Sequence, residues 1–358
     1  MTGLDPERLR RLTLDRQLLL ARRDIRAVDA LRHLGGLNAQ HRRSPYIALW
    51  SRLKGFRREE LETALASGQA CKATLMRGTL HLVADDDYPL FFAGLAKARL
   101  RAFRSFFPQV APSIPEERVQ AVLRDALRTA PVAFRDLERL LAPDFPGWPL
   151  ASLSFAAKAL APIVQLPPAG HWHGGGAPLY GWAGHVPGPA REAAEEYLME
   201  RYLAAFGPAT LQDFAQWSGL GVGEAQAVRK RLGDRLTGSG PLLDLWAPPA
   251  AVFGEELPVR FLARWDNLLL AYRDRSRLLD PDLQQRVVMR DGRVLATFLV
   301  AGQVAGTWDV EETARQTTLV LQPLRSLAGR WREQLAREAE DLCRWLRPDR
   351  PAALRLAQ

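Results

Sequence analysis

Pro208-Ala209-Thr210-Leu211-Gln212-Asp213-Phe214-Ala215-Gln216-Trp217-Ser218-Gly219-Leu220 carries the clearest fold signal of the chain. Thr210 is expected to be the N-cap of a helix, Asp213 occupies the capping-box position, and Gly219 is placed to end the helix. A second helix is predicted from Glu224 to Leu232. Together they form a helix-turn-helix, a building block that binds DNA in some proteins and serves as scaffold in others.

Upstream of this unit, the same order of helices followed by a short hairpin is predicted twice. In residues 1–110, leucine-rich amphipathic helices precede strands between Ala70 and Val83. Residues 111–190 repeat this order, with helices and then strands predicted at 134–141, 150–160, 163–166 and 179–182. With residues 191–250 as the third unit, the sequence predicts three tandem winged helices.

After Pro248-Pro249 the pattern changes to strands. The turn Asp291-Gly292 lies between alternating apolar runs and predicts a hairpin. A long amphipathic helix, with Leu327 and Leu346 on its apolar face, is expected to cover the sheet. Residues 251–358 are therefore predicted to form an antiparallel, β-barrel-like domain with a long closing helix, and the fold class is α+β.

Composition and charge narrow the choice of partner and compartment. The 358-residue chain has a formal net charge of +9 and a sequence pI near 10.0, a balance that favours nucleic acid or another polyanion. It contains no run of about 18 apolar residues and no signal-peptide pattern at its start, so we expect a cytoplasmic protein with no membrane contact. Cys71 and Cys343 share no metal-ligand spacing and are expected to be core residues.

Two segments rich in Arg and Lys contain no acidic residue. One runs from His41 to Arg58, and the other from Tyr88 to Pro115. Such segments could neutralise several DNA phosphates, which would make affinity strongly dependent on salt. The alternative is a pair of solvated helix faces, although those usually mix both charge signs. Arg229 and Lys230, on the second helix of the third unit, are also suited to phosphate.

Two loops could be mistaken for chemical sites. His171-Trp172-His173-Gly174-Gly175-Gly176 could hold a metal, but it has the composition of a wing, and we expect its His and Trp side chains to meet DNA or solvent. Residues 262–275 are dense in charge and, taken alone, predict a strand and turn whose charges pair locally. No metal site, Schiff-base lysine or catalytic triad is evident.

Asn38 and Gln40 are the uncharged amides whose position suggests chemistry. Gly35 and Gly36 come just before them and should end the preceding helix. Residues two apart share a face only in an extended segment, so a joint role for the two amides requires a strand or loop. From these residues alone, a solvated turn remains the alternative.

The chain resembles the AlkZ/YcaQ-like bacterial DNA glycosylases over essentially its whole length. The resemblance rests on four segments, Leu37-Asn38-Ala39-Gln40, Met76-Arg77-Gly78-Thr79-Leu80-His81-Leu82-Val83, Phe206-Gly207-Pro208-Ala209-Thr210 and Trp265-Asp266-Asn267-Leu268-Leu269-Leu270-Ala271-Tyr272-Arg273-Asp274-Arg275. It implies tandem winged helices and a β-barrel in a C-shaped body around duplex DNA. It also implies removal of bulky N7-alkylated purines, including interstrand crosslinks. Several members of that family protect antibiotic producers from their own genotoxins.

The resemblance assigns roles to residues of this chain. The family signature is Gln, an apolar residue, then Gln or Asp, and it falls on Asn38-Ala39-Gln40, where Asn38 replaces the first Gln. The remaining predicted site residues are Arg77, Thr79, His81 and Asp266 lining the active site, and His41, Arg42, Arg43, Arg52, Lys54, Arg229 and Lys230 contacting DNA. We expect a monomer without metal or cofactor, acting on double-stranded DNA that carries alkylated purines.

The implied mechanism follows from the substrate. A purine alkylated at N7 is positively charged and leaves as a neutral base, so two amides that hold a water by its hydrogen and oxygen would suffice. The favoured hypothesis is a monofunctional glycosylase without lyase activity, in which the Asp291-Gly292 hairpin or the wings probe the DNA groove. The alternative is a non-catalytic winged-helix DNA-binding protein, either a regulator or a lesion sensor.

Overall fold

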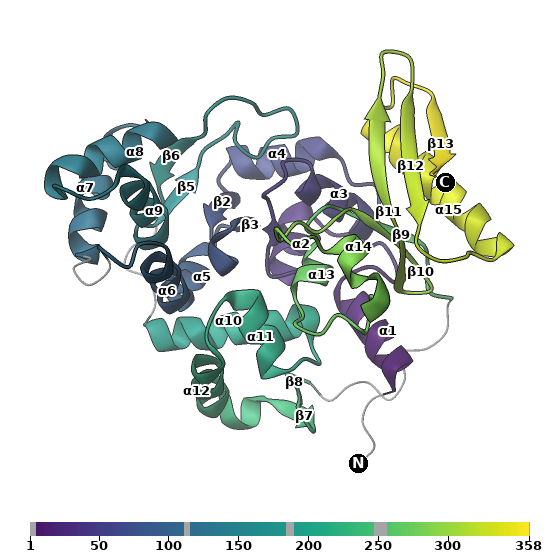
Figure 1. The fold of residues 1–358 in the computed structure, drawn as a ribbon, viewed down its shortest axis with the longest axis horizontal. Helices are drawn as coiled ribbons and strands as arrows, with labels where there is room; N and C mark the ends of the chain where they lie inside the picture. Colours follow the sequence, from purple (N-terminus) through teal and green to yellow (C-terminus); the bar gives the residue numbers. More distant parts are fainter. Residues whose placement is uncertain (1–4, 111–114, 184–189, 247–255, 358) are drawn as a thin grey trace.

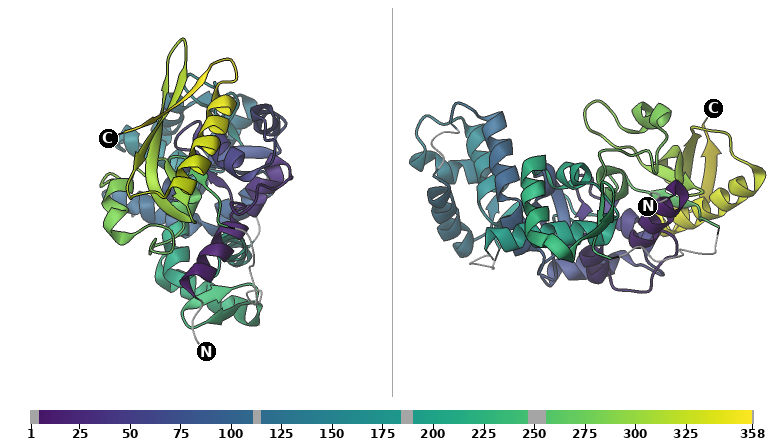
Figure 2. Two further views of the ribbon diagram at one scale, coloured as in Figure 1. Left: turned by 90° about the vertical axis from the view of Figure 1, so that its right-hand side faces the viewer. Right: turned by 90° about the horizontal axis from the view of Figure 1, so that it is seen from below.

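The computed structural model describes residues 5–110, 115–183, 190–246 and 256–357. Seen from below, the ribbon has a crescent outline, with the second unit at one end and the C-terminal strands at the other (Figure 2). The boundaries expected near residues 111 and 250 fall outside the described residues.

The helices occur mainly in the first two thirds of the chain (Figure 1). They are α1 (Pro6–Arg16), α2 (Ala27–His33), α3 (Ser44–Arg52), α4 (Arg58–Ala66), α5 (Tyr88–Gly94), α6 (Ala96–Phe106), α7 (Glu116–Thr129), α8 (Phe134–Leu141), α9 (Leu150–Leu160), α10 (Arg191–Phe206), α11 (Leu211–Ser218), α12 (Val222–Leu232), α13 (Asn267–Leu270), α14 (Gln284–Val287) and α15 (Gly329–Leu346).

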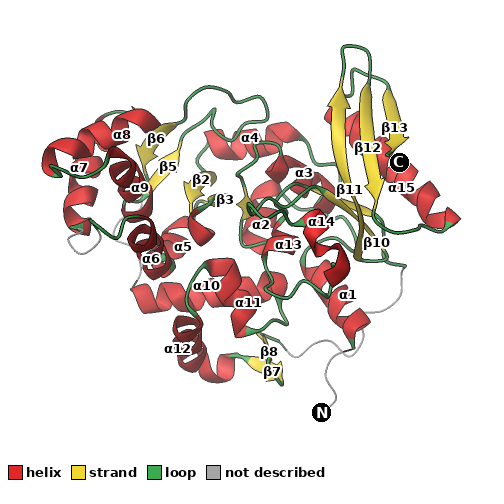
Figure 3. Ribbon diagram, in the orientation of Figure 1, coloured by secondary structure: helices red, strands yellow, loops and turns green. Residues whose placement is uncertain are grey.

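Within the described residues the strands form three sheets, and the α+β class is confirmed (Figure 3). They are β1 (Leu37–Asn38), β2 (Ala70–Thr74), β3 (Leu80–Ala84), β4 (Val132–Ala133), β5 (Ile163–Gln165), β6 (Leu179–Trp182), β7 (Thr237–Ser239), β8 (Leu242–Asp244), β9 (Arg260–Leu262), β10 (Thr297–Val300), β11 (Gln303–Glu312), β12 (Thr317–Pro323) and β13 (Ala352–Leu356).

The first two units share one sheet. Its strand order is β1-β3-β2-β5-β6-β4, so the hairpin β2–β3 of the first unit continues into the hairpin β5–β6 of the second. Lys72 on β2 pairs with Gln165 on β5 at this junction. The two units are therefore joined by backbone pairing and not only by the chain between them.

The helix-turn-helix predicted from Pro208 to Leu232 is confirmed. Thr210 caps α11, and its hydroxyl oxygen accepts the backbone N–H of Asp213 at 3.1 Å. Gly219 ends the helix at a φ of 85°, a left-handed conformation that glycine adopts without steric cost. Helix α12 then starts two residues earlier than predicted, at Val222.

The C-terminal sheet differs from the predicted antiparallel barrel. Among the described residues it is an open five-stranded sheet in the order β13-β12-β11-β10-β9. Its edge strand β13 runs parallel to β12. The reason is the long helix α15, which lies between β12 and β13 and returns the chain to the same end of the sheet, as a βαβ crossover does.

The predicted hairpin around Asp291-Gly292 is mostly absent as regular strand. The turn itself forms, because the Met289 N–H donates to the Arg293 carbonyl at 2.8 Å. Its flanks pair only at an isolated bridge between Val288 and Val294. Residues 284–287 are instead the short helix α14, which follows the helix-start signal Asp280-Pro281.

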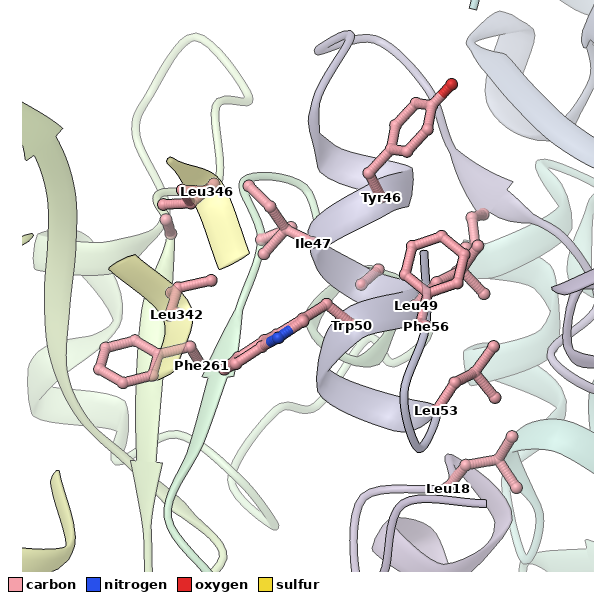
Figure 4. Close-up of a cluster of buried hydrophobic side chains, with 14 of the residues drawn as sticks. Leu18, Tyr46, Ile47, Leu49, Trp50, Leu53, Phe56, Phe261, Leu342 and Leu346 are labelled. Carbon is pink, nitrogen blue, oxygen red and sulfur yellow. The ribbon is translucent and has the colours of Figure 1, made fainter. Parts of the chain in front are cut away.

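The core joins parts of the chain that the sequence suggested would be separate. Helix α3 packs on two sides, with Ile47 and Trp50 facing Phe261 and the α15 leucines while other apolar side chains face the first unit (Figure 4). Both cysteines are buried and free, as predicted. None of the described helices combines the length and apolar character that crossing a membrane requires.

Candidate active site

The segment Gly35-Gly36 follows the end of α2, as predicted, and leads Asn38 into the extended strand β1. Both glycines have positive φ values, 65° and 84°, and they turn the chain from α2 into β1. A Cβ on Gly36 would lie 2.6 Å from a Val83 methyl carbon, so a side chain cannot be accommodated there without movement. Strand β1 then pairs with β3, with Asn38 opposite His81.

The two amides of the motif have different surroundings. Asn38 is buried, at 4% exposure, and its Oδ1 accepts the backbone N–H of Gln40 at 3.1 Å. Its Nδ2 is 3.5 Å from the Thr79 hydroxyl. Gln40 is exposed, and its Oε1 accepts the backbone N–H of Leu80 at 3.2 Å. Gln40 is therefore the member of the pair whose side chain can meet a substrate.

Gln40 lines a pocket of about 580 Å³ between the first unit and the C-terminal sheet. The pocket is rich in cations and also holds apolar and acidic groups. Its lining comprises Gln40, His41, Arg42, Arg43, Ser44, Ile47, Arg264, Ala296, Trp308, Asp309, Val310, Glu312 and Leu346. Asn38 is not among them.

Two of the pocket's arginines are held by acids of β11. Arg43 pairs with Glu312 at 2.6 Å, and Arg264 pairs with Asp309 at 2.7 Å. His41 lies beside them, with its Nδ1 3.2 Å from the Ser44 hydroxyl. Burial and the guanidinium groups of Arg264, Arg43 and Arg42 lower the pKa of His41, so its ring is neutral at pH 7.

The predicted lining residues Arg77, Thr79 and His81 are not among the residues that line the pocket, although Thr79 and His81 lie beside Asn38. The Thr79 hydroxyl donates to the Met76 carbonyl at 2.9 Å, and the His81 Nδ1–H donates to the Thr79 carbonyl at 3.0 Å. His81 Nε2 is buried without a partner. Burial and the nearby Arg77 lower the pKa of His81 to about 3. Arg77 donates to the Trp217 carbonyl at 2.5 Å.

Arg52 and Asp266 form a buried ion pair. Two hydrogen bonds of 2.8 and 2.9 Å join the guanidinium to the carboxylate, and both side chains are fully buried. Arg52 was expected to contact DNA and Asp266 to line the active site. A phosphate cannot reach this buried guanidinium, and Asp266 is not among the residues that line the pocket.

The other predicted DNA-contacting residues lie at the surface or at its edge. Arg42 and Lys54 are exposed, and Arg42 also donates to the Gly174 carbonyl at 2.5 Å. Arg229 and Lys230 are exposed on α12, beside the β7–β8 hairpin and apart from the Gln40 pocket. The structure thus brings His41, Arg42 and Arg43 together with Gln40.

Much of the second basic segment is engaged within the protein. Lys97 pairs with Glu195 at 2.8 Å, and Arg101 pairs with Glu224 at 2.5 Å. Arg99 is buried and donates to the Ala159 carbonyl at 2.6 Å. These cations stabilise the packing of α6 against its neighbours, and that accounts for them without a polyanion.

The loop expected to be a free wing is docked. Trp172 is 1% exposed and contacts the core between α3, α4 and α15, so it meets neither DNA nor solvent. The guanidinium carbons of Arg58 and Arg43 lie 4.0 and 4.7 Å from its ring centroid, within cation–π distance. Its backbone N–H donates to Glu62 at 2.9 Å.

Comparison with family profiles identifies the protein family of this chain. The AlkZ-like profile, described as DNA glycosylase AlkZ-like, matches residues 31–345. The chain belongs to the AlkZ-like DNA glycosylase family. Its fold is similar to that of the Streptomyces sahachiroi DNA glycosylase AlkZ, with a TM-score of 0.82 and 19% sequence identity over 99% of this chain and 100% of that one. No curated protein sequence matches significantly.

Membership of the AlkZ-like family confirms the resemblance, but one pocket residue and one buried residue beside the motif were not predicted. Arg264 lines the pocket, and Asn267 hydrogen-bonds Asn38. Both belong to the segment 262–275, whose charges were expected to pair locally. That expectation was wrong for Arg264 and Asp266, which pair with Asp309 and Arg52. The sequence signal was a cluster of charged and polar residues around an apolar run. That signal did not indicate which distant residues the charges would pair with.

Metal-ligating side chains do not gather in the part of this AlkZ-like chain that the structure describes. No group of three or more His, Cys, Asp or Glu side chains there could hold an ion. His171 and His173 lie on the docked loop, and His173 is exposed. The polar side chains that line the pocket are one amide, one imidazole, three guanidinium groups, one hydroxyl and two carboxylates.

Proposed function

We propose that the protein is a monofunctional DNA glycosylase that hydrolyses the N-glycosidic bond of bulky N7-alkylated purines in duplex DNA. The observation that carries the proposal is the exposed amide of Gln40 at the wall of a pocket lined by Arg42, Arg43 and Arg264. Family membership supplies the reaction class, because the matching profile is that of a DNA glycosylase.

The chemistry of the substrate suits uncharged residues. An N7-alkylated purine is a cation and departs as a neutral base, so no general acid is needed. The enzyme then has to place a water against C1′ of an oxocarbenium-like sugar. Gln40, oriented by Asn38, would hold that water. The pocket's two carboxylates, Glu312 and Asp309, are paired with Arg43 and Arg264. An amide in place of a free carboxylate base forgoes about 10²–10⁴-fold of general-base assistance. The enzyme should act poorly on unmodified bases.

A monofunctional reaction is supported by the composition of the pocket. A lyase step would need an amine nucleophile that attacks the sugar. No lysine is among the described residues that line the pocket. Hydrolysis by water would leave an abasic site and an intact strand.

The DNA would lie along the cation-bearing pocket. Arg42 is exposed beside Gln40, and Lys54 is exposed beyond the C-terminal end of α3. Both would neutralise phosphates, with Arg229 and Lys230 as a separate contact on α12. The turn at Asp291-Gly292 and the hairpin β7–β8 are the elements we propose to probe the groove, within tandem winged-helix units. We also propose a monomer that acts in the cytoplasm, on crosslinks or toxin adducts.

A second function is favoured by one observation. The Oδ1 of Asn38 accepts the Gln40 N–H, and Asn38 does not line the pocket, so Gln40 is the only member of the pair whose amide faces it. A non-catalytic DNA-binding protein, either a regulator or a lesion sensor, would tolerate this arrangement. It would bind alkylated duplex DNA and release nothing.

The experiment that separates the two functions uses excess enzyme and one duplex. The probe contains a single N7-methylguanine, and released base and strand breaks are measured together. We expect base release above the uncatalysed rate, with breaks appearing only after alkaline treatment. Binding of the duplex without release of this base or of a bulkier N7 adduct would contradict the enzyme function. Breaks without alkali would contradict the monofunctional mechanism.

A further inference from the structure

We propose that Asn267 is a positioning residue, which fixes the geometry of the Asn38–Gln40 segment although it lies 229 residues away from Asn38 in the sequence. Its side chain is 2% exposed and lies outside the pocket, so it touches neither DNA nor water at the reacting centre. The inference rests on the proposed glycosylase function for its catalytic consequence. Its structural part stands on hydrogen bonds alone.

Asn267 makes hydrogen bonds to the edge strand β1 that a neighbouring strand would otherwise make. Strand β1 is at the edge of its sheet, with β3 on one side only. On the free side, the Asn38 N–H donates to Asn267 Oδ1 at 2.9 Å, and Asn267 Nδ2 donates to the Gly36 carbonyl at 2.6 Å. One amide therefore pairs with a donor and an acceptor of the edge strand, as a neighbouring backbone would.

The constraint continues from Asn38 to Gln40. Asn38 Oδ1 accepts the Gln40 N–H at 3.1 Å, a local turn that suits the short side chain of Asn. Gln40 Oε1 in turn accepts the Leu80 N–H at 3.2 Å. Asn267 thus holds Asn38, and Asn38 holds the backbone of Gln40. Both residues act through Gln40.

Asn267 is itself held rigidly. The preceding residue Asp266 caps α13, because its Oδ1 accepts the Leu268 N–H at 3.0 Å. The Asp266 carboxylate is paired with Arg52, which also donates to the Ala48 carbonyl at 3.1 Å within α3. Helix α3 starts four residues after Gln40. Through Asp266 and Arg52, Asn267 is therefore connected to α3, the helix that follows the Asn38–Gln40 motif.

The consequence for catalysis is a loss of rate without a loss of binding. A displacement of about 1 Å at a positioned group can cost about 10²-fold in rate. The variant N267A removes both hydrogen bonds to β1 and should lower the single-turnover rate by about this factor. Since Asn267 is buried away from the pocket, the dissociation constant for the duplex should change less than threefold.

The near-isosteric variant N267D gives a readout that a purely structural role would not. A carboxylate keeps the acceptor for the Asn38 N–H but places a negative oxygen against the Gly36 carbonyl. Once protonated, the carboxyl group can donate to that carbonyl as the amide does. We expect the N267D rate to recover towards wild type as pH falls, after subtraction of uncatalysed release, while the wild-type rate shows no such recovery.

The matched control is Q165A. Gln165 is another buried amide on a strand of the same sheet, and its Nε2 donates to the Tyr180 hydroxyl at 2.8 Å. Q165A should lose thermal stability like N267A but keep the wild-type rate on the N7-methylguanine duplex. A wild-type rate in N267A would overturn the proposal. So would parallel losses of rate in N267A and Q165A, or an N267D rate that ignores pH.

Hydrogen–deuterium exchange tests the inference even if the wild type releases no base. We expect the amides of Asn38 and Gln40 to exchange at least tenfold faster in N267A than in wild type or in Q165A. Equal protection in all three proteins would overturn the positioning role. Absence of release by wild type with this faster exchange would count against the proposed function alone.

Discussion

At the residue scale, Asn38 and Gln40 divide tasks that the sequence suggested they share. The two glycines before them correctly predicted the end of the preceding helix, and both have positive φ. The burial of Asn38 could not be predicted, because it depends on Asn267 and Thr79, which are 229 and 41 residues away in the chain. The side chain that is one methylene shorter than Gln fits this buried turn.

His81 supplies a pH prediction at the same scale. Its folded pKa of about 3 lies below the value near 6.5 expected when unfolded, so the unfolded chain binds the extra proton first. Stability should therefore be lost as pH falls below about 6.5, by up to about 1.4 kcal/mol per pH unit. We compare the unfolding free energy, measured with urea, between pH 6 and pH 4. Its dependence on pH should be shallower in H81N than in wild type, by the contribution of about one bound proton. Equal slopes in both proteins would contradict this role of His81.

At the element scale, local signals predicted elements well where the signal was complete. Helix α8 has the predicted bounds, and α11 has the predicted N-cap and end. Strand β13 was missed because five residues after a helix carry little periodicity. The docked loop around Trp172 was misjudged because its glycines suggested a wing, whereas burial of Trp172 is decided by Arg58 and Arg43, distant in sequence.

The docked loop gives a stability prediction. W172A should lower the free energy of unfolding by about 3–5 kcal/mol, the usual cost of removing a buried Trp side chain. It should also increase proteolysis between residues 168 and 178, since the loop loses its anchor. H173A, which changes the exposed neighbour, is the control and should leave both measurements near wild type. Similar losses in the two variants would mean that the loop is not held by Trp172.

At the scale of the whole molecule, the N-terminal unit and the C-terminal region share a core. Composition predicted a DNA partner and the pattern of elements predicted α+β, but neither could predict that Arg52 and Asp266 would meet. Such pairing between distant segments depends on the tertiary arrangement. Because of the shared core and this ion pair, the N-terminal unit and the C-terminal region are not independent of each other.

Breaking that buried pair should destabilise the molecule as a unit. D266A leaves the Arg52 charge uncompensated and should cost about 3–5 kcal/mol in urea unfolding. D309A removes the partner of Arg264 in a pair whose acid is 67% exposed, and it should cost less than about 1 kcal/mol. The double variant R52M/D266L should recover much of the D266A loss. Similar losses of unfolding free energy in D266A and D309A would contradict a larger stabilising contribution from the buried pair.

The central claim is that Gln40 performs chemistry at a pocket whose cations bind DNA, and one assay on the N7-methylguanine duplex tests it most directly. Single-turnover rate and dissociation constant are measured together for wild type, Q40A and R42A across a salt series. We predict that Q40A loses at least about 10²-fold in rate with unchanged affinity, while R42A loses affinity and lowers the salt slope by about 0.9. A Q40A protein that releases the base at the wild-type rate, or that loses binding as R42A does, would contradict the claim.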